Sequence, residues 1–301
     1  MALGLKEILE FVKVEHTLFS LPFVFIGAFL TAPALMEYHG DDGISWFPGL
    51  LPLFWILVAA VGARGLAMAL NRIIDREIDA SNPRTASRHL ASGSMSISTA
   101  WGLCTVFLAM LVLGAWQLNT VALQLAWLPV VAFVIYPYLK RSTWLCHLWL
   151  GVCLGLAPAG AWLGIVGGDL GWEAIAGLYW YPDILLISLG VMLWITAFDL
   201  GYALMDVDND LATGIHSFPS RFGMTMALRT AVGLTATWLI LLILAHQEPF
   251  WIVACIIAAV TNIRAFTADN SNMDGFQRRL FRTSVSTGWL LLAGLLLGMM
   301  V

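Results

Sequence analysis

Residues 97–139 read ISTAWGLCTVFLAMLVLGAWQLNTVALQLAWLPVVAFVIYPYL. They belong to a longer stretch, from His89 to Leu139, that contains no Asp, Glu, Lys or Arg. A helix needs about 20 mainly apolar residues to cross the hydrocarbon layer of a membrane, which is roughly 30 Å thick. The stretch is long enough for two such helices, and the polar turn Gln117-Leu118-Asn119-Thr120 predicts where one ends and the next begins.

Further charge-free stretches of similar character occur along the rest of the chain. They are His16–Met36, Gly43–Ala63, Ser142–Gly168, Ile184–Phe198, Thr230–Gln247, Pro249–Ile263 and Thr283–Val301. Together with the two helices in the first stretch, they predict an all-α integral membrane protein with nine transmembrane helices.

The overall composition agrees with a membrane protein. Of the 301 residues, 60% are hydrophobic and only 11% are charged, whereas a soluble domain carries about 25% charged residues. This excludes a single water-soluble globule. The 14 Trp and 16 Phe exclude a disordered chain. The net charge of −4 argues against a nucleic-acid partner, because such partners require a basic surface.

The basic residues predict the orientation in the membrane. Nine helices place all 15 Lys and Arg on the side of the N-terminus: Lys6, Lys13, Arg64, Arg72, Arg76, Arg84, Arg88, Lys140, Arg141, Arg221, Arg229, Arg264, Arg278, Arg279 and Arg282. The opposite loops hold only acidic charges: Glu37, Asp41, Asp42, Asp169, Glu173, Asp183 and Glu248. The positive-inside rule then predicts a cytoplasmic N-terminus. Residues 1–15, with apolar side chains among Lys and Glu, are typical of an amphipathic helix on the membrane surface.

Two acidic motifs follow the second and the sixth predicted span. The first reads N-x-x-x-D-x-x-x-D from Asn71 to Asp79, and the second Y-x-x-x-D-x-x-x-D from Tyr202 to Asp210. Each matching position is displaced by 131 residues, as from 71 to 202. Because four spans separate the motifs, they run in the same direction, which favours two four-helix pseudo-repeats.

The spacing within each motif suggests a metal site. Side chains four residues apart share a helical face, so Asp75 and Asp79 repel each other there unless a cation bridges them, as do Asp206 and Asp210. Mg²⁺ is commonly held by one or two carboxylates together with phosphate oxygens. For either motif alone, a solvated acidic loop is an equally good interpretation. Two motifs in matched register on one membrane side favour the metal site.

Arginines near the first motif suggest an anionic ligand. Arg84 and Arg88 follow it closely, and guanidinium groups bind phosphate oxygens in a bidentate fashion. The alternative is that Arg84 and Arg88 only contribute to the positive charge of the cytoplasmic loops and bind no ligand. Arg64 lies inside the second span, on the helical face of Asn71 and Asp75, and a charged residue within a membrane helix is a functional candidate. The alternative is that the Arg64 side chain only extends to the nearby membrane surface, where its charge reaches water.

These residues carry a resemblance to the UbiA superfamily of intramembrane aromatic prenyltransferases. The resemblance rests on the two acidic motifs, on Arg84-Thr85-x-x-Arg88, on Tyr136-Pro137-x-x-Lys140-Arg141 and on Asp199-x-x-Tyr202-Ala203 before Asp206. The branch of 4-hydroxybenzoate polyprenyltransferases, which includes members that make menaquinone by the futalosine route, is similar in Glu15-His16-Thr17-Leu18-Phe19, in Asn71-Arg72 and in Ile215-His216-Ser217-Phe218-Pro219. Two positions depart from the common pattern. Arg72 replaces an Asp, and His89 replaces a Pro.

The resemblance implies a single domain over residues 1–301, with the helices around a central cavity. It implies transfer of a polyprenyl group from an isoprenyl diphosphate to an aromatic acid in quinone biosynthesis, in a prokaryotic-type inner membrane with the active site on the cytoplasmic side. The implied Mg²⁺ ligands are Asn71, Asp75, Asp79, Asp206 and Asp210. Arg84 and Arg88 are expected to bind the diphosphate and the Tyr202 ring to stabilise the allylic cation. Asp199 is expected to orient either the acceptor or a metal-bound water.

The acceptor is the least determined part of this hypothesis. Lys140 and Arg141, with Tyr136 before them, are expected to bind the carboxylate of 4-hydroxybenzoate or of a bicyclic analogue, 1,4-dihydroxy-6-naphthoate. Arg64 is kept as a further substrate-binding candidate, and His147 is interpreted as a packing residue. An alternative from a different class is an ion-coupled membrane transporter, which would need paired charges deep along a path. The part of the protein that is expected on the outer side of the membrane offers few ionisable groups for such a path.

Overall fold

A computed structural model describes residues 4–40, 43–269 and 271–301. Asp41 and Asp42, which the charge analysis places in an outer loop, lie outside the described residues, as do residues 1–3 of the expected surface helix. The described parts are helical, without a strand: α1 (Leu5–Phe11), α2 (Val14–Phe29), α3 (Ala32–His39), α4 (Leu50–Ile74), α5 (Arg76–Ser81), α6 (Ile97–Leu118), α7 (Thr120–Leu125), α8 (Trp127–Leu139), α9 (Cys146–Leu170), α10 (Glu173–Ala176), α11 (Asp183–Tyr202), α12 (Val207–Thr213), α13 (Phe218–Phe222), α14 (Met224–Ala245), α15 (Pro249–Thr267) and α16 (Met273–Met300).

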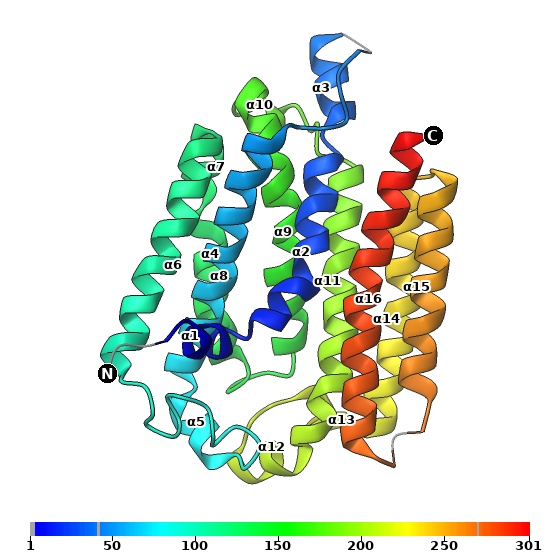
Figure 1. The fold of residues 1–301 in the computed structure, drawn as a ribbon. Coiled ribbons are helices and arrows are strands. Elements are labelled where there is room, and N and C mark those ends of the chain that lie inside the picture. Colours follow the sequence, from blue (N-terminus) through cyan, green and yellow to red (C-terminus); the bar gives the residue numbers. More distant parts are fainter. Residues whose placement is uncertain (1–3, 41–42, 270) are drawn as a thin grey trace.

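Within these described residues, nine helical segments are long and apolar enough to cross a membrane. They are Thr17–His39, Leu50–Ile74, Ile97–Leu118, Thr120–Leu139, Cys146–Leu170, Asp183–Thr213, Met224–Ala245, Pro249–Thr267 and Met273–Met300. Each corresponds to one of the expected spans, so the predicted number of spans is confirmed. The helices form one bundle, in which α5 and α12 lie at the same end and the C-terminus lies at the other (Figure 1).

The expected break between the third and fourth span lies at Asn119. This residue has an extended backbone, and its side chain caps α7 by accepting a hydrogen bond from the Ala122 N–H at 2.8 Å. Its amide group also donates to the carbonyls of Leu163 and Gly164 on α9, at 2.9 and 3.1 Å. One polar side chain therefore ends one helix, starts another and attaches both to a third.

Glycines allow α4 and α6 to pack closely. A Cβ atom at Gly62 would lie 2.5 Å from the backbone nitrogen of Leu111, and one at Gly114 would lie 2.8 Å from Ala59. Small residues at such contacts let membrane helices approach each other, where van der Waals packing provides much of the attraction. Asn71, the first residue of the first acidic motif, lies on α4.

We expect Gly62→Val to destabilise the protein, because its added atoms have no room against Leu111. Overpacking of this kind costs about 1–3 kcal/mol, which thermal unfolding of detergent-purified protein would show as a lower Tm. Gly102→Val on α6 is the matched control, since a Cβ at Gly102 meets no atom within 4 Å. Equal Tm values for the two variants would contradict the close packing of α4 and α6.

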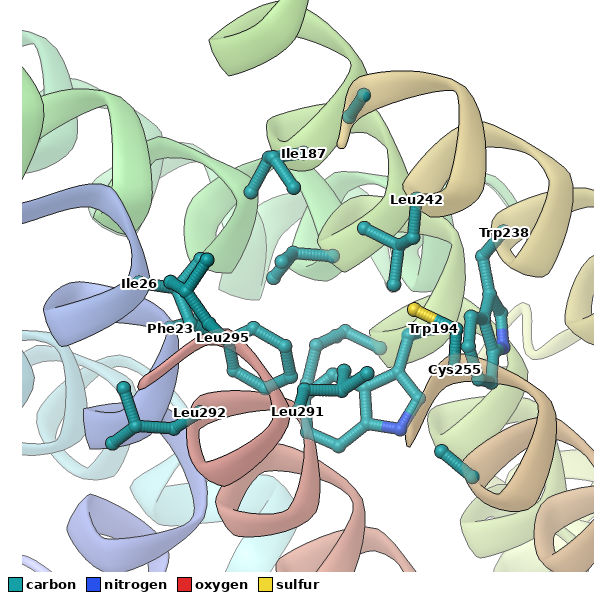
Figure 2. Packing of buried hydrophobic residues seen from close by; sticks show 14 of the residues in the cluster. Phe23, Ile26, Ile187, Trp194, Trp238, Leu242, Cys255, Leu291, Leu292 and Leu295 are labelled. Carbon is teal, nitrogen blue, oxygen red and sulfur yellow. The ribbon is translucent and has the colours of Figure 1, made fainter. Parts of the chain in front are cut away.

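Two clusters of buried apolar side chains hold the bundle together. The larger one joins α2, α9, α11, α14, α15 and α16. Figure 2 shows part of it, with labelled side chains from α2, α11, α14, α15 and α16. The smaller cluster joins α4, α6 and α8 and includes Phe11, which is 2% exposed. Phe11 anchors α1 to the bundle, while Lys6 and Glu10 of the same helix are exposed. The helix is thus amphipathic, and its location on a membrane surface remains a prediction.

Candidate active site

A large apolar cavity of about 810 Å³ lies within the bundle. Its walls come from α2, α4, α6, α7, α8, α9 and α11. Asn71, Asp199 and Tyr202 line the end near the two acidic motifs. On α4, lining residues extend from Asn71 to Ile56, which at 1.5 Å per residue is a depth of about 22 Å. The cavity therefore extends through most of a hydrocarbon layer of roughly 30 Å.

Asp75 lies where α4 ends and is completely buried. It accepts a hydrogen bond of 2.9 Å from the Asn71 amide, and the Lys140 ammonium contacts the same carboxylate oxygen. A nitrogen of Arg141 lies 3.5 Å from the other oxygen. Burial raises the pKa of the Asp75 carboxyl above its usual value, and Lys140 and Arg141 act in the opposite direction.

Asp79 is buried on α5 between two arginines. Its carboxylate lies 2.6 Å from Arg88 and 3.8 Å from Arg72. Arg72 stands where the resemblance leads one to expect an Asp, and it is itself buried, being 5% exposed. The departure from the family pattern thus adds a positive charge beside the first motif in place of a carboxylate.

Asp206 connects the second motif to the first. It lies in the short 3-10 turn that follows α11. Arg84 donates two hydrogen bonds to its carboxylate, at 2.8 and 2.5 Å, and the Asn82 amide donates another at 2.9 Å. Because Asn82 and Arg84 follow the first motif in the chain, these contacts bring together the two loops that the sequence predicts to face each other.

Asp210 and Tyr202 complete the second motif. Asp210 is buried on α12 and receives a hydrogen bond from the Ser217 side chain. The Tyr202 hydroxyl accepts a hydrogen bond of 2.6 Å from Gln277, and the Arg84 guanidinium lies 5.9 Å from the centre of the Tyr202 ring. The ring also lines the cavity, so it connects the charged residues to the apolar interior.

The charged residues around the two motifs form one group, which we call the charged cluster. Its members are Asp75, Asp79, Asp206 and Asp210 with Arg72, Arg84, Arg88, Lys140 and Arg141. Glu77 and Asp208 belong to the same motif segments but are exposed. The helical face expected from the four-residue spacing is therefore the face that is buried.

Arg64 lies apart from the charged cluster, in the wall of the cavity. Its Nε atom is buried without a hydrogen-bond partner, and among the described residues no carboxylate forms an ion pair with it. Tyr136 and Cys153, which are close enough to influence it electrostatically, line the same cavity. A guanidinium nitrogen buried without a partner is costly, which indicates a place for an anionic ligand.

His147 is a residue whose role the sequence interpretation missed. Its Nδ1 lies 2.7 Å from an oxygen of Asp199, and its Nε2 accepts a hydrogen bond of 3.0 Å from the Phe218 N–H. Asn82 was also not singled out, although it holds Asp206. A single polar residue in an apolar stretch, such as His147, gives no sequence signal that distinguishes packing from such a contact, and the partner of Asn82 is 124 positions away in the chain.

The carboxylates of the charged cluster suit Mg²⁺ in their chemistry. Mg²⁺ needs few protein carboxylates when phosphate oxygens and water supply its other ligands. Among the described residues, no three His, Cys, Asp or Glu side chains are grouped as a metal site. Instead, a cationic side chain contacts each of Asp75, Asp79 and Asp206. The donor set therefore fits a metal that binds together with an anionic ligand.

Comparisons with known sequences agree with this chemistry. A family model described as the UbiA prenyltransferase family matches residues 20–285. The mitochondrial 4-hydroxybenzoate polyprenyltransferase of Schizosaccharomyces pombe is 30% identical over 190 residues, 63% of this chain and 50% of that protein. The 4-hydroxybenzoate octaprenyltransferase of Coxiella burnetii is 30% identical over 206 residues, 63% of this chain and 67% of that protein. The match thus spans half of the yeast relative.

Solved structures share the fold over nearly the whole chain. The apo structure of a UbiA homolog from Aeropyrum pernix K1 has a TM-score of 0.79 and 30% identity, and the match covers 94% of this chain and 98% of that one. A UbiA homolog from Archaeoglobus fulgidus, bound to GPP and Mg²⁺, has the same fold with a TM-score of 0.61 at 18% identity, over 95% and 99% of the two chains. Since the family model covers most of the sequence and the fold agrees throughout, this chain belongs to the UbiA prenyltransferase family, whose relatives are named as prenyl-transferring enzymes.

Proposed function

We propose that this protein transfers a polyprenyl group from an isoprenyl diphosphate to an aromatic acid in membrane quinone biosynthesis. The observation that carries the proposal is the position of the charged cluster at the end of a deep apolar cavity. The cluster suits a diphosphate with its metal, and the cavity suits a hydrocarbon tail. Family membership supports an enzyme over an ion-coupled transporter.

The charged cluster would hold the diphosphate. Asp75, Asp79, Asp206 and Asp210, with the Asn71 amide, would hold Mg²⁺, which when bound neutralises the diphosphate and favours its departure. Arg84 and Arg88 would exchange their carboxylate partners for phosphate oxygens, because guanidinium groups bind both kinds of oxygen bidentately.

The cavity would protect the allylic carbon and stabilise its positive charge. The π face of Tyr202 can stabilise a cation by about 2 kcal/mol or more in a site without water. The apolar walls keep water away from the prenyl carbon, so that the aromatic ring rather than water attacks it.

Arg64 is the residue that we assign to the carboxylate of the acceptor. It lines the cavity without an ionic partner, and Tyr136 beside it offers a wall for an aromatic ring. Lys140, which the sequence suggests for the same task, contacts Asp75 in the structure. We assign Lys140 and Arg141 to the diphosphate side instead. Both 4-hydroxybenzoate and 1,4-dihydroxy-6-naphthoate carry the carboxylate that this arrangement requires.

The direct test is prenyl transfer by membranes that contain the protein. They are supplied with Mg²⁺, a long-chain prenyl diphosphate and one acceptor at a time: 4-hydroxybenzoate, 1,4-dihydroxy-6-naphthoate or an aromatic ring without a carboxylate. We expect a prenylated product with at least one of the two acids, and none in membranes with the Asp75→Ala protein. Product with only the ring that lacks a carboxylate would overturn the aromatic-acid proposal.

The proposed orientation places the charged cluster in the cytoplasm. Because nine spans are an odd number, a tag before Met1 should lie inside and a tag after Val301 outside. Protease treatment of intact spheroplasts should therefore remove the C-terminal tag only. Removal of both tags, or of neither, would contradict the nine-span orientation.

Lys140→Met should shift the acid limb of the pH–activity profile to higher pH. Lys140 opposes the rise in the pKa of Asp75 that burial causes, so its loss raises that pKa further. At a given acidic pH fewer Asp75 groups are then ionised and able to bind a metal. The profile of kcat/KM at saturating Mg²⁺ measures the shift. Arg229→Met, at an exposed position outside the cluster, should leave the profile unchanged.

A further inference from the structure

His147 and Asp199 form a pair at the cavity wall that the binding of diphosphate does not use. His147 lies in the first turn of α9 and is 5% exposed. Its Nδ1 lies 2.7 Å from the Oδ2 atom of Asp199 on α11, and its Nε2 lies 3.0 Å from the backbone nitrogen of Phe218. The ring of His147 on α9 therefore contacts two other segments of the chain, α11 and α13.

The partners of the imidazole determine where its proton lies. A backbone N–H can only donate, so the Nε2 atom that faces Phe218 must accept. A neutral imidazole has one acceptor and one donor nitrogen, so Nδ1 carries the hydrogen and donates it to Asp199. The histidine thus donates to one oxygen of Asp199 and holds that carboxylate in a fixed position.

Asp199 differs from the other carboxylates near the site. It is the one acidic residue among the described residues that line the cavity, and its partner is a neutral imidazole. Asp75, Asp79 and Asp206 are instead paired with Lys or Arg. A carboxylate without a cationic partner is the better proton acceptor, because a nearby cation favours its ionised form. Arg64 and Tyr136 line the same cavity.

We infer that Asp199, positioned by His147, accepts the proton that the aromatic acceptor loses during prenyl transfer. The inference rests on the proposed function. A pair of ring electrons forms the bond to the prenyl carbon while the C–O bond to diphosphate breaks. The C–H bond at the attacked ring carbon then breaks, its electrons restore the aromatic ring, and its proton moves to Asp199. Asp199 later passes the proton to the departing diphosphate, so that charge and atoms balance.

Asp199→Asn tests this role, because the amide keeps the size of the side chain and cannot accept the proton. We expect kcat to fall by about 10²–10⁴-fold, the usual contribution of a general base, with little change in the KM of either substrate. A 4-hydroxybenzoate deuterated at the attacked carbon should give an isotope effect near unity with the natural protein. The effect should rise clearly above unity with Asp199→Asn, because loss of the ring proton becomes rate-limiting.

Asp183→Asn is the matched control, since Asp183 is an exposed acidic residue in the first turn of the same helix. It should leave kcat and the isotope effect unchanged. If the natural protein prenylates its acceptor and Asp199→Asn does so at an undiminished rate, the inference is wrong while the proposed function stands. A higher acceptor KM with unchanged kcat would make Asp199 an orienting residue and would also overturn the inference.

Variants of His147 separate positioning from packing. His147→Asn retains an N–H donor toward Asp199, whereas His147→Leu removes it and keeps an apolar side chain of similar bulk. We expect His147→Leu to show a raised isotope effect and His147→Asn to recover most of the lost kcat. Equal kcat losses in both variants, without an isotope effect in either, would indicate a packing role only and would remove His147 from the inference.

Discussion

Asp206→Ala is expected to lower kcat by about a hundredfold or more while the protein remains folded. The loss of one group that stabilises developing charge in an active site typically has this size. Asp206 lies in a turn between two helices and is not part of a packed core, so its removal leaves the bundle intact. The measurement is kcat at saturating Mg²⁺, with the Tm of the purified protein as the check on folding.

Asp208→Ala is the control for this variant. Asp208 lies two residues further along the chain and is exposed, so we expect at least half of the natural activity. The pair Asp75→Ala and Glu77→Ala repeats the comparison in the first motif. More than about a tenth of the natural activity in Asp206→Ala would contradict a metal-binding role for that residue.

Arg64→Leu is expected to raise the KM of the aromatic acid roughly thirtyfold or more, with little effect on the KM of the prenyl diphosphate. Breaking a buried pair between a charged ligand and its partner costs about 2–5 kcal/mol, and each 1.4 kcal/mol corresponds to a factor of ten. The variant removes a guanidinium whose Nε atom is buried without a partner, so the free protein should be at least as stable as the natural one.

Arg229→Leu provides the control, because Arg229 is an exposed arginine of α14 that does not line the cavity. Its KM values should not change. Equal increases in both KM values for Arg64→Leu would place Arg64 in the diphosphate site. If the KM of the acceptor increases more in Lys140→Met than in Arg64→Leu, Lys140 and not Arg64 binds the acceptor carboxylate.

The number of spans was predictable from sequence because a membrane imposes a simple requirement. Apolar stretches of sufficient length must become helices, since in hydrocarbon only internal hydrogen bonds satisfy the backbone. The turn at Asn119 was predictable for the same reason, as a polar side chain in an otherwise apolar stretch needs partners. It finds them in the carbonyls of Leu163 and Gly164.

The partners of the charged residues were not predictable in the same way. The four-residue spacing indicated which carboxylates share a face, because this depends only on local helix geometry. The contacts of Arg84 with Asp206 and of Lys140 with Asp75 join residues 122 and 65 positions apart. Such contacts depend on how the spans pack, and the sequence gives no register between them. His147 illustrates the limit, since its two partners lie on α11 and α13.

The ion pairs of the charged cluster have a thermodynamic consequence for ligand binding. Without ligand, Asp75, Asp79 and Asp206 are already compensated by basic side chains. A metal arriving alone must compete with these side chains, and a diphosphate arriving alone must approach the carboxylates. When the two bind together, the metal takes the carboxylates, and the diphosphate takes the basic side chains that those carboxylates release. The affinity for each should therefore increase in the presence of the other, and reciprocity requires both increases to be the same factor.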